Sequence, residues 1–120
     1  MKRLQIVALT FFTSCSLSMP SAVLAYGPVD CVRDAAQADK DMLMRLAVEL
    51  CAGASSPAVS QCYRDALKVD SGMLRRHAID LCAGSTNAKN TLDCYRKASR
   101  LGMFRSHATT LCSARNAPFP

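Results

Sequence analysis

The residues most able to do chemistry in this chain are its seven cysteines. A pair of thiols can form a disulfide, and a larger group can hold a metal. After a lone Cys15, six cysteines recur at near-regular intervals: Cys31, Cys51, Cys62, Cys82, Cys94 and Cys112. The sequence contains no C-x-x-C or HExxH spacing of the kind that binds zinc. We therefore expect three disulfides, and no metal or other cofactor.

Residues 1–25 have the layout of a secretory signal peptide. Two basic residues are followed by an apolar stretch over residues 4–12, and small residues lead up to Ala25. Cleavage after Ala25 would remove Cys15 and leave the even set of six. The apolar stretch is too short to span a bilayer, and no later stretch is long enough, so no transmembrane segment is expected after cleavage. We expect a secreted or periplasmic protein.

The sequence before Cys15 leaves one alternative open. Phe12-Thr13-Ser14-Cys15 loosely resembles a bacterial lipoprotein box, which would make Cys15 a lipid-modified N-terminus that anchors the chain. Phe is atypical at the first position of such a box, and the exit at Ala25 is better formed. Cleavage after Ala25 is the preferred interpretation, and lipid anchoring through Cys15 is the minor one.

Two short motifs recur three times in the rest of the chain. CVRDAA returns as CYRDAL and CYRKAS, and LAVELCAG returns as HAIDLCAG and HATTLCSA. The copies define units over about residues 28–53, 56–84 and 87–114, and the third unit is two residues shorter between its motifs. Residues 117–120 show no periodicity and are expected to form a loose tail. Repeats of this length are typical of helical units that stack on one another.

Each unit reads as two short helices joined by a turn. In the second unit Ser56 and Pro57 open the first helix, residues 70–72 interrupt it, and Gly84 stands where a left-handed C-terminal cap falls. Asp41 is expected to cap the second helix of unit one. Alternation with period two is absent. The sequence therefore predicts an all-α fold of three tandem disulfide-stapled helical hairpins, with about six short helices in a solenoid-like row or a compact bundle.

The second helix of each unit is expected to bury an apolar stripe. The positions predicted to face inward are Met42, Leu43, Leu46, Ala47, Leu50 and Cys51 in unit one, Met73, Leu74, His77, Ala78, Leu81 and Cys82 in unit two, and Met103, Phe104, His107, Ala108, Leu111 and Cys112 in unit three. Helices of about eleven residues are marginal alone in water. The fold must therefore rest on packing between helices and on cross-links.

Two disulfide schemes are compatible with these hairpins. Pairing within units joins positions that face each other at the open end of an antiparallel hairpin, and gives Cys31–Cys51, Cys62–Cys82 and Cys94–Cys112. Pairing between neighbouring units gives Cys51–Cys62 and Cys82–Cys94, which leaves the first and last cysteines free unless the stack closes. We prefer the within-unit scheme.

Five arginines are candidates for an anionic-ligand face. They are Arg33, Arg64 and Arg96, which stand two residues after each leading cysteine, with Arg75 and Arg76 beside them. The simpler interpretation is a solvated face on which arginines pair with Asp34 and Asp65. The sequence lacks interleaved aromatic residues for stacking on bases, so no specific nucleic acid is expected as a ligand.

Two histidines take equivalent positions in units two and three. A metal site would need His77 and His107 close together with further ligands, and no activated nucleophile accompanies them for catalysis. We interpret both as half-buried packing residues, and Tyr63 and Tyr95 as core residues. No catalytic residue is predicted.

The CY…A-x-x-LCAG repeat, which covers the chain after the signal segment, resembles uncharacterised bacterial exported proteins with tandem cysteine-bounded units. This resemblance implies no activity and no site. The hairpins are also similar in architecture to tetratricopeptide and Sel1-like repeats, whose glycine and aromatic signatures are absent here. The sequence favours a non-enzymatic protein-binding or envelope structural module, whose partner is an unknown protein or an anionic envelope component. The alternative is a secreted cationic effector, namely an antimicrobial, a toxin or an enzyme inhibitor.

Overall fold

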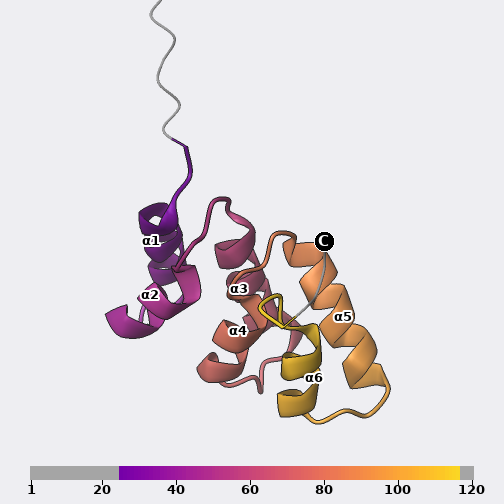
Figure 1. Cartoon of the computed structure of the whole chain (residues 1–120). Helices are drawn as coiled ribbons and strands as arrows, with labels where there is room; N and C mark the ends of the chain where they lie inside the picture. Colours follow the sequence, from indigo (N-terminus) through magenta and orange to yellow (C-terminus); the bar gives the residue numbers. More distant parts are fainter. Residues whose placement is uncertain (1–24, 117–120) are drawn as a thin grey trace, which may run out of the picture.

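The computed structural model describes residues 25–116, so the signal segment up to residue 24, Cys15 and the tail 117–120 lie outside the described residues. The described chain forms six helices: α1 (Pro28–Ala38), α2 (Met44–Cys51), α3 (Ala58–Val69), α4 (Arg75–Cys82), α5 (Ala88–Arg100) and α6 (Arg105–Cys112). Consecutive helices pair into three hairpins (Figure 1). The prediction of an all-α fold of three hairpins is confirmed. None of these six helices is long and apolar enough to cross a membrane.

The three hairpins form an open row of two layers. In the layer of first helices, α3 packs against both α1 and α5, and in the layer of second helices, α4 packs against both α2 and α6. No helix of unit one contacts a helix of unit three in the described chain. One side chain does cross the row, because Arg115 Nη2 donates to the carbonyl of Glu49 at 2.8 Å. The arrangement is a short solenoid rather than a closed bundle.

The core between the layers is made mostly of small residues. Alanines and half-cystines account for more than half of the buried apolar positions, and Tyr63, Tyr95, Leu50, Ile79 and Leu81 are the largest side chains in it. Alanine removes little apolar area from water. Hydrophobic burial is therefore a weak source of stability here, and covalent links have a correspondingly large share.

Each hairpin is closed by one disulfide at its open end. The pairs are Cys31–Cys51, Cys62–Cys82 and Cys94–Cys112, with Cα–Cα distances of 5.6, 5.5 and 5.6 Å. Each bond joins the first helix of its unit to the last residue of the second. Closing a loop of about 20 residues contributes about 3 kcal/mol to stability.

The second helix of each hairpin begins later than the sequence suggested. Leu43, Leu74 and Phe104 are N-cap residues with extended backbone and precede the helices, so they do not share the inward stripe. The prediction that these three face inward is wrong, because their side chains are 55%, 63% and 75% exposed. Asp41 does not cap α2 either, since it lies in the turn, where its N–H donates to Asp39 Oδ1 at 3.1 Å.

Three further inward predictions fail in unit three, where Met103 is 36% exposed although its equivalent Met73 is 7% exposed. Leu111 is 61% exposed and His107 is also exposed, although their equivalents in unit two, Leu81 and His77, are buried and half-buried. The physical reason for Leu111 is its place in the last hairpin of the described residues, where no neighbouring hairpin covers this face. At the helix ends, Gly84 follows α4 with φ of 77°, as predicted for a left-handed C-terminal cap.

Candidate binding surface

Neighbouring hairpins are joined by the same trio of side chains at both junctions. Asp39, the C-cap of α1, accepts a hydrogen bond from the Tyr63 hydroxyl at 2.7 Å and two from the Arg75 guanidinium. Asp70, the C-cap of α3, accepts from the Tyr95 hydroxyl at 2.7 Å and from Arg105 at 2.7 and 3.0 Å. The carboxylate belongs to one unit and both donors belong to the next. We call each trio a junction triad.

The triads perturb the titration of their members. The guanidinium of Arg75 lowers the pKa of Asp39, and that of Arg105 lowers the pKa of Asp70, while the tyrosine hydroxyls add to both effects. Burial is the first cause that raises the pKa of Tyr63 and Tyr95, and the hydrogen bonds to the carboxylates add to it. Each triad is therefore most stable with an ionised aspartate and neutral tyrosine.

The triads predict how stability depends on pH. An aspartate whose pKa is lower in the folded than in the unfolded chain stabilises the fold above its unfolded pKa of about 3.9, and this contribution is lost as the pH falls towards the folded pKa. Below about pH 4, the free energy of unfolding should drop more steeply in the native protein than in the double variant Asp39→Asn/Asp70→Asn. Urea unfolding between neutral pH and about pH 2 measures both slopes. Equal slopes would contradict the prediction.

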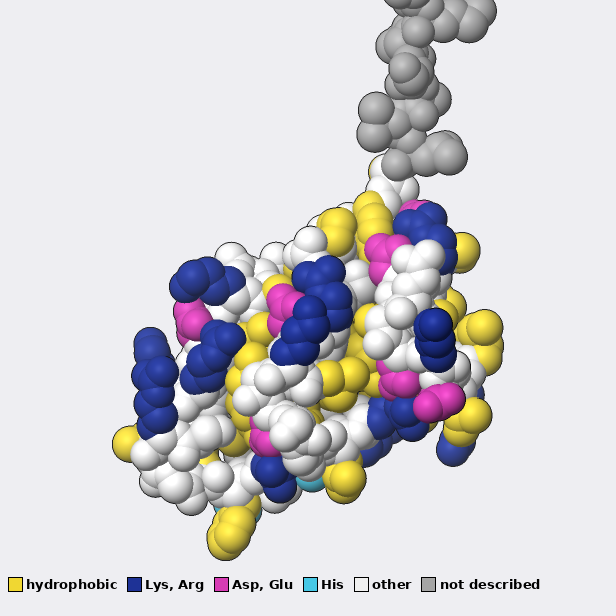
Figure 2. Space-filling model, turned by 180° about the vertical axis from the view of Figure 1, so that it is seen from behind, with side chains coloured by type: hydrophobic (Ala, Val, Ile, Leu, Met, Phe, Trp, Pro, Cys, Tyr) yellow, Lys and Arg dark blue, Asp and Glu magenta, His cyan; other side chains and the backbone are white. Residues whose placement is uncertain are grey.

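The five arginines of the predicted anionic-ligand face all have carboxylate partners within the chain. Arg33 pairs with Asp30 and Asp34, Arg64 with Asp65, Arg96 with Asp93, Arg75 with Asp39, and Arg76 with Glu49 and Asp80. Lys and Arg side chains accordingly adjoin Asp and Glu on the surface seen in Figure 2. An anionic polymer would have to displace these carboxylates, and Arg75 is already part of a junction triad.

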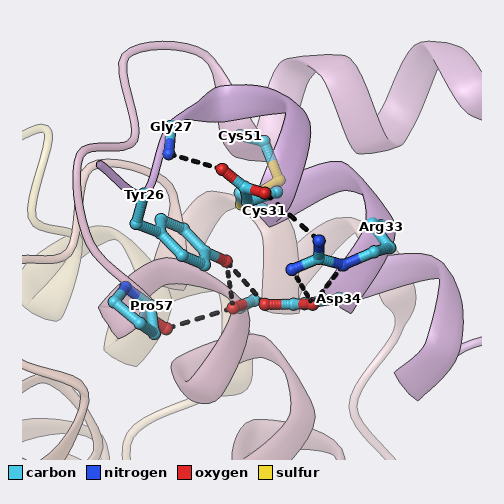
Figure 3. Close-up of polar contacts among 9 residues, drawn as sticks. Tyr26, Gly27, Cys31, Arg33, Asp34, Cys51 and Pro57 are labelled. Atoms are coloured by element: carbon cyan, nitrogen blue, oxygen red, sulfur yellow. Dashed lines mark hydrogen bonds and ion pairs between the residues drawn. A yellow bond between two sulfur atoms is a disulfide. The ribbon is translucent and has the colours of Figure 1, made fainter. Parts of the chain in front are cut away.

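The segment before α1 is tied to the first two units. The Tyr26 hydroxyl donates to Asp34 Oδ2 at 2.8 Å and lies 3.1 Å from Ser60 Oγ of α3, while Asp30 accepts from the N–H of Gly27 at 2.9 Å (Figure 3). Asp34 also pairs with Arg33. These hydrogen bonds and ion pairs connect the segment before α1 to the helices α1 and α3.

The two histidines lie on separate helices, α4 and α6. The ring of His107 packs edge-on against that of Phe104, with 5.9 Å between centroids. His77 is half-buried, and its Nδ1 has no hydrogen-bond partner. Within residues 25–116, no three His, Cys, Asp or Glu side chains are grouped as metal ligands.

A row of exposed apolar side chains runs along the edge where the hairpins turn. Leu43, Leu74 and Phe104 occupy the same position in each unit, directly before the second helix, and are 55%, 63% and 75% exposed. Hydrophobic side chains project from the lower edge of the molecule in Figure 2. We call these three residues the turn ridge.

The turn ridge lowers stability in two ways. Ser, Thr, Asp and Asn are the favoured N-cap residues because their side chains accept an N–H of the first helical turn, and replacing them by an apolar residue costs about 1 kcal/mol. None of the three ridge residues makes such a bond. Each also leaves a large apolar side chain in water. All three units depart from the N-cap preference at this position, and Phe104 regains only its edge-on contact with His107. A costly exposed feature that is repeated in every unit is a candidate for contact with another molecule.

The comparisons with known proteins give no external guide. No protein-family model, no curated protein and no solved structure matches this chain. The turn ridge and the junction triads must therefore be interpreted from the chain's own contacts.

Proposed function

We propose that this protein is a non-enzymatic binding module that acts outside the cytoplasm and holds a partner protein along the turn ridge. The observation that carries the proposal is the exposure of Leu43, Leu74 and Phe104 at one equivalent position in every unit. The pairing of the candidate arginines with carboxylates gives less support to a cationic effector, because it leaves less free positive charge for anionic surfaces.

The disulfides support a location in an oxidising compartment. Such bonds persist in the periplasm and in secreted proteins, and are rare in the cytosol. Small domains with limited hydrophobic burial depend on them for stability. Together with the signal peptide expected over residues 1–25, the three bonds favour a secreted or periplasmic protein.

The spacing of the turn ridge favours an amphipathic helix of the partner as its ligand. Packed helices lie about 8–10 Å apart, so successive ridge side chains are separated by roughly that distance. In an α-helix, residues seven positions apart are separated by about 10.5 Å, since each residue adds 1.5 Å. A helix with apolar residues at every seventh position could therefore contact Leu43, Leu74 and Phe104 together. Because disulfides and junction triads fix the row, little entropy would be lost on binding.

Replacing Leu74 by serine should stabilise the folded protein while weakening binding. Leu74 has extended backbone at an N-cap, so a serine hydroxyl there can accept an N–H of the first turn of α4. We expect the free energy of unfolding to rise by about 0.5–1 kcal/mol. Urea unfolding monitored by helical circular dichroism measures the change.

The adjacent residue provides a matched control. Met73 is only 7% exposed, so Met73→Ser should destabilise the protein by at least about 2 kcal/mol. If Leu74→Ser were as harmful as Met73→Ser, the turn ridge would have a structural role and the main support for the proposal would disappear.

The partner can be sought with a photocrosslinking residue at position 74, with exposed Ser55 in the α2–α3 loop as the control position. A single protein captured from position 74 but not from 55 is then purified, and its affinity for native protein and for Leu74→Ser is measured. We expect at least a tenfold loss with the variant. Unchanged affinity would reject the ridge as the binding surface. Ridge-dependent binding to anionic lipid vesicles in place of any protein would assign the ridge to a membrane and overturn the proposal.

A further inference from the structure

The first unit exposes a face that is buried in the other two. At two positions that face the preceding unit, units two and three bury their side chains almost fully, as Ser60 at 5% and Ile79 at 0% exposure illustrate. The same positions in unit one are occupied by Val29 and Val48, which are 82% and 54% exposed. Together with Met44, which is 67% exposed, they form what we call the front face.

The third unit exposes the opposite face. Leu81 of unit two is fully buried, but the equivalent Leu111 is 61% exposed. Met73 is 7% exposed, and the equivalent Met103 is 36% exposed. With Leu101, which is 80% exposed, Met103 and Leu111 form the back face. A shallow groove of the third hairpin is lined by all three of these residues.

The front and back faces lack complementary parts of the junction triad. In unit one, Val32 stands where later units have the triad tyrosine, and Met44 stands where they have the triad arginine. In unit three, the C-cap of the first helix is Leu101, whereas the earlier units have Asp39 and Asp70. The front face thus lacks both donors, and the back face lacks the acceptor.

These two faces are unusual for the ends of a repeat protein. Terminal repeats normally carry polar outer faces, which keep the stack soluble and stop it from growing. Here the front and back faces, together with the turn ridge, contain every large apolar side chain recorded as exposed within residues 25–116. Hydrophobic side chains are visible at the end of the molecule below the grey segment in Figure 2.

We propose that copies of this protein associate head to tail, with the back face of one copy seated on the front face of the next. This contact continues the interface that joins units one to two and two to three inside each chain. At this contact the front face has no triad tyrosine or arginine, and the back face has no triad aspartate. The contact therefore buries no charged triad residue that lacks its partner. Head-to-tail contacts between unlike faces form a ring if the rotation closes and an open filament if it does not. The row inside one chain stays open, because no helix of unit one contacts a helix of unit three within residues 25–116, so the same contact repeated between copies favours a linear assembly. The inference goes beyond the proposed function, and it does not depend on the turn ridge binding anything.

The assembly would have a consequence for the turn ridge. Copies stacked in this way place their ridges in one line, so that several weak sites can act on one partner or on an array of partners. Binding to linked sites gains affinity through effective concentration without any new kind of contact.

Two end-blocking variants test the proposal. Val48→Arg places a charge on the front face and Leu111→Arg places one on the back face, and both residues are more than half exposed, so the fold should tolerate the changes. Sedimentation velocity of the exported, oxidised protein is measured from about 10 μM to 1 mM, a range suited to small interfaces. Native protein should grow past the dimer with concentration. Each variant alone should remain monomeric, with at least tenfold weaker association.

Mixing the variants gives the decisive measurement. Val48→Arg keeps an intact back face and Leu111→Arg keeps an intact front face, so the mixture should form a one-to-one dimer and nothing larger. Leu74→Ser, which alters only the turn ridge, should associate like native protein, which separates this proposal from the proposed function. Native protein that stays monomeric throughout would overturn the inference. So would dimers of Val48→Arg alone, because these would show that back faces pair with each other.

Discussion

Replacing Cys62 and Cys82 together by alanine is expected to destabilise the whole protein by about 3 kcal/mol or more. Both residues are fully buried and close the middle hairpin. Domains of this size are stable by roughly 5–15 kcal/mol, so the loss is a large fraction of the total. The middle hairpin packs against both neighbours, and its loss should therefore release all six helices. Urea unfolding followed by circular dichroism measures the change.

The third disulfide provides the control. Cys94 is partly exposed, and α5 and α6 are covered on one side only. Replacing Cys94 and Cys112 by alanine should unlock unit three and leave units one and two folded. Hydrogen exchange distinguishes the outcomes, because protection would disappear in α5 and α6 only. Equal loss of protection in every helix of both variants would mean that the row unfolds as one unit, and that the position of a disulfide within it does not matter.

The sequence was sufficient to predict the helices and the hairpins because those features repeat. Three copies of each cysteine motif keep the same register, so the two-helix unit and its shortened turn in unit three follow from alignment alone. The left-handed backbone of Gly84, with φ of 77°, could be predicted because a helix often ends at a residue in this conformation, which glycine adopts without a steric clash.

The turn ridge was missed because periodicity does not show where a helix begins. Leu74 and Phe104 match the apolar stripe when they are counted as helical, and only the later start of α4 and α6 removes them from it. A signal was available, since each of these residues follows a methionine that is itself placed to complete the stripe. In unit two the methionine takes the inward place, because Met73 is 7% exposed whereas Leu74 is 63% exposed.

The junction triads were missed for a different reason. Their members are 24–36 residues apart, and no local pattern links residues at that distance. The aligned units do contain a trace of them: the aspartate is present in units one and two, whereas the tyrosine and arginine are present in units two and three. An acceptor in one repeat and its donors in the next repeat indicate a contact between neighbouring repeats. The donors are absent from unit one and the acceptor is absent from unit three, which are the first and last units of the row.

Removing the carboxylate of Asp70 is expected to detach unit three from unit two. Asp70 accepts hydrogen bonds from Tyr95 and Arg105, and its side chain is 20% exposed. Hydrogen bonds to charged groups contribute about 1.5–3 kcal/mol, and the buried hydroxyl of Tyr95 would lose its acceptor. We expect Asp70→Ala to lower the free energy of unfolding by about 2–3 kcal/mol. Urea unfolding gives the total, and hydrogen exchange should show lost protection in α5 and α6 first.

Asp93, on the surface of α5, is the matched control. Both of its ion-pair partners, Lys89 and Arg96, lie on the same helix, so Asp93→Ala should lower stability much less than Asp70→Ala does. A double-mutant cycle of Asp70→Ala with Arg105→Ala then isolates the interaction across the junction, for which we expect a coupling that stabilises the folded state and exceeds the error of the measurement. A coupling near zero would reduce the triad to an ordinary surface ion pair. Apolar packing alone would then hold the units together. The missing donors in unit one and the missing acceptor in unit three would then no longer support the head-to-tail contact.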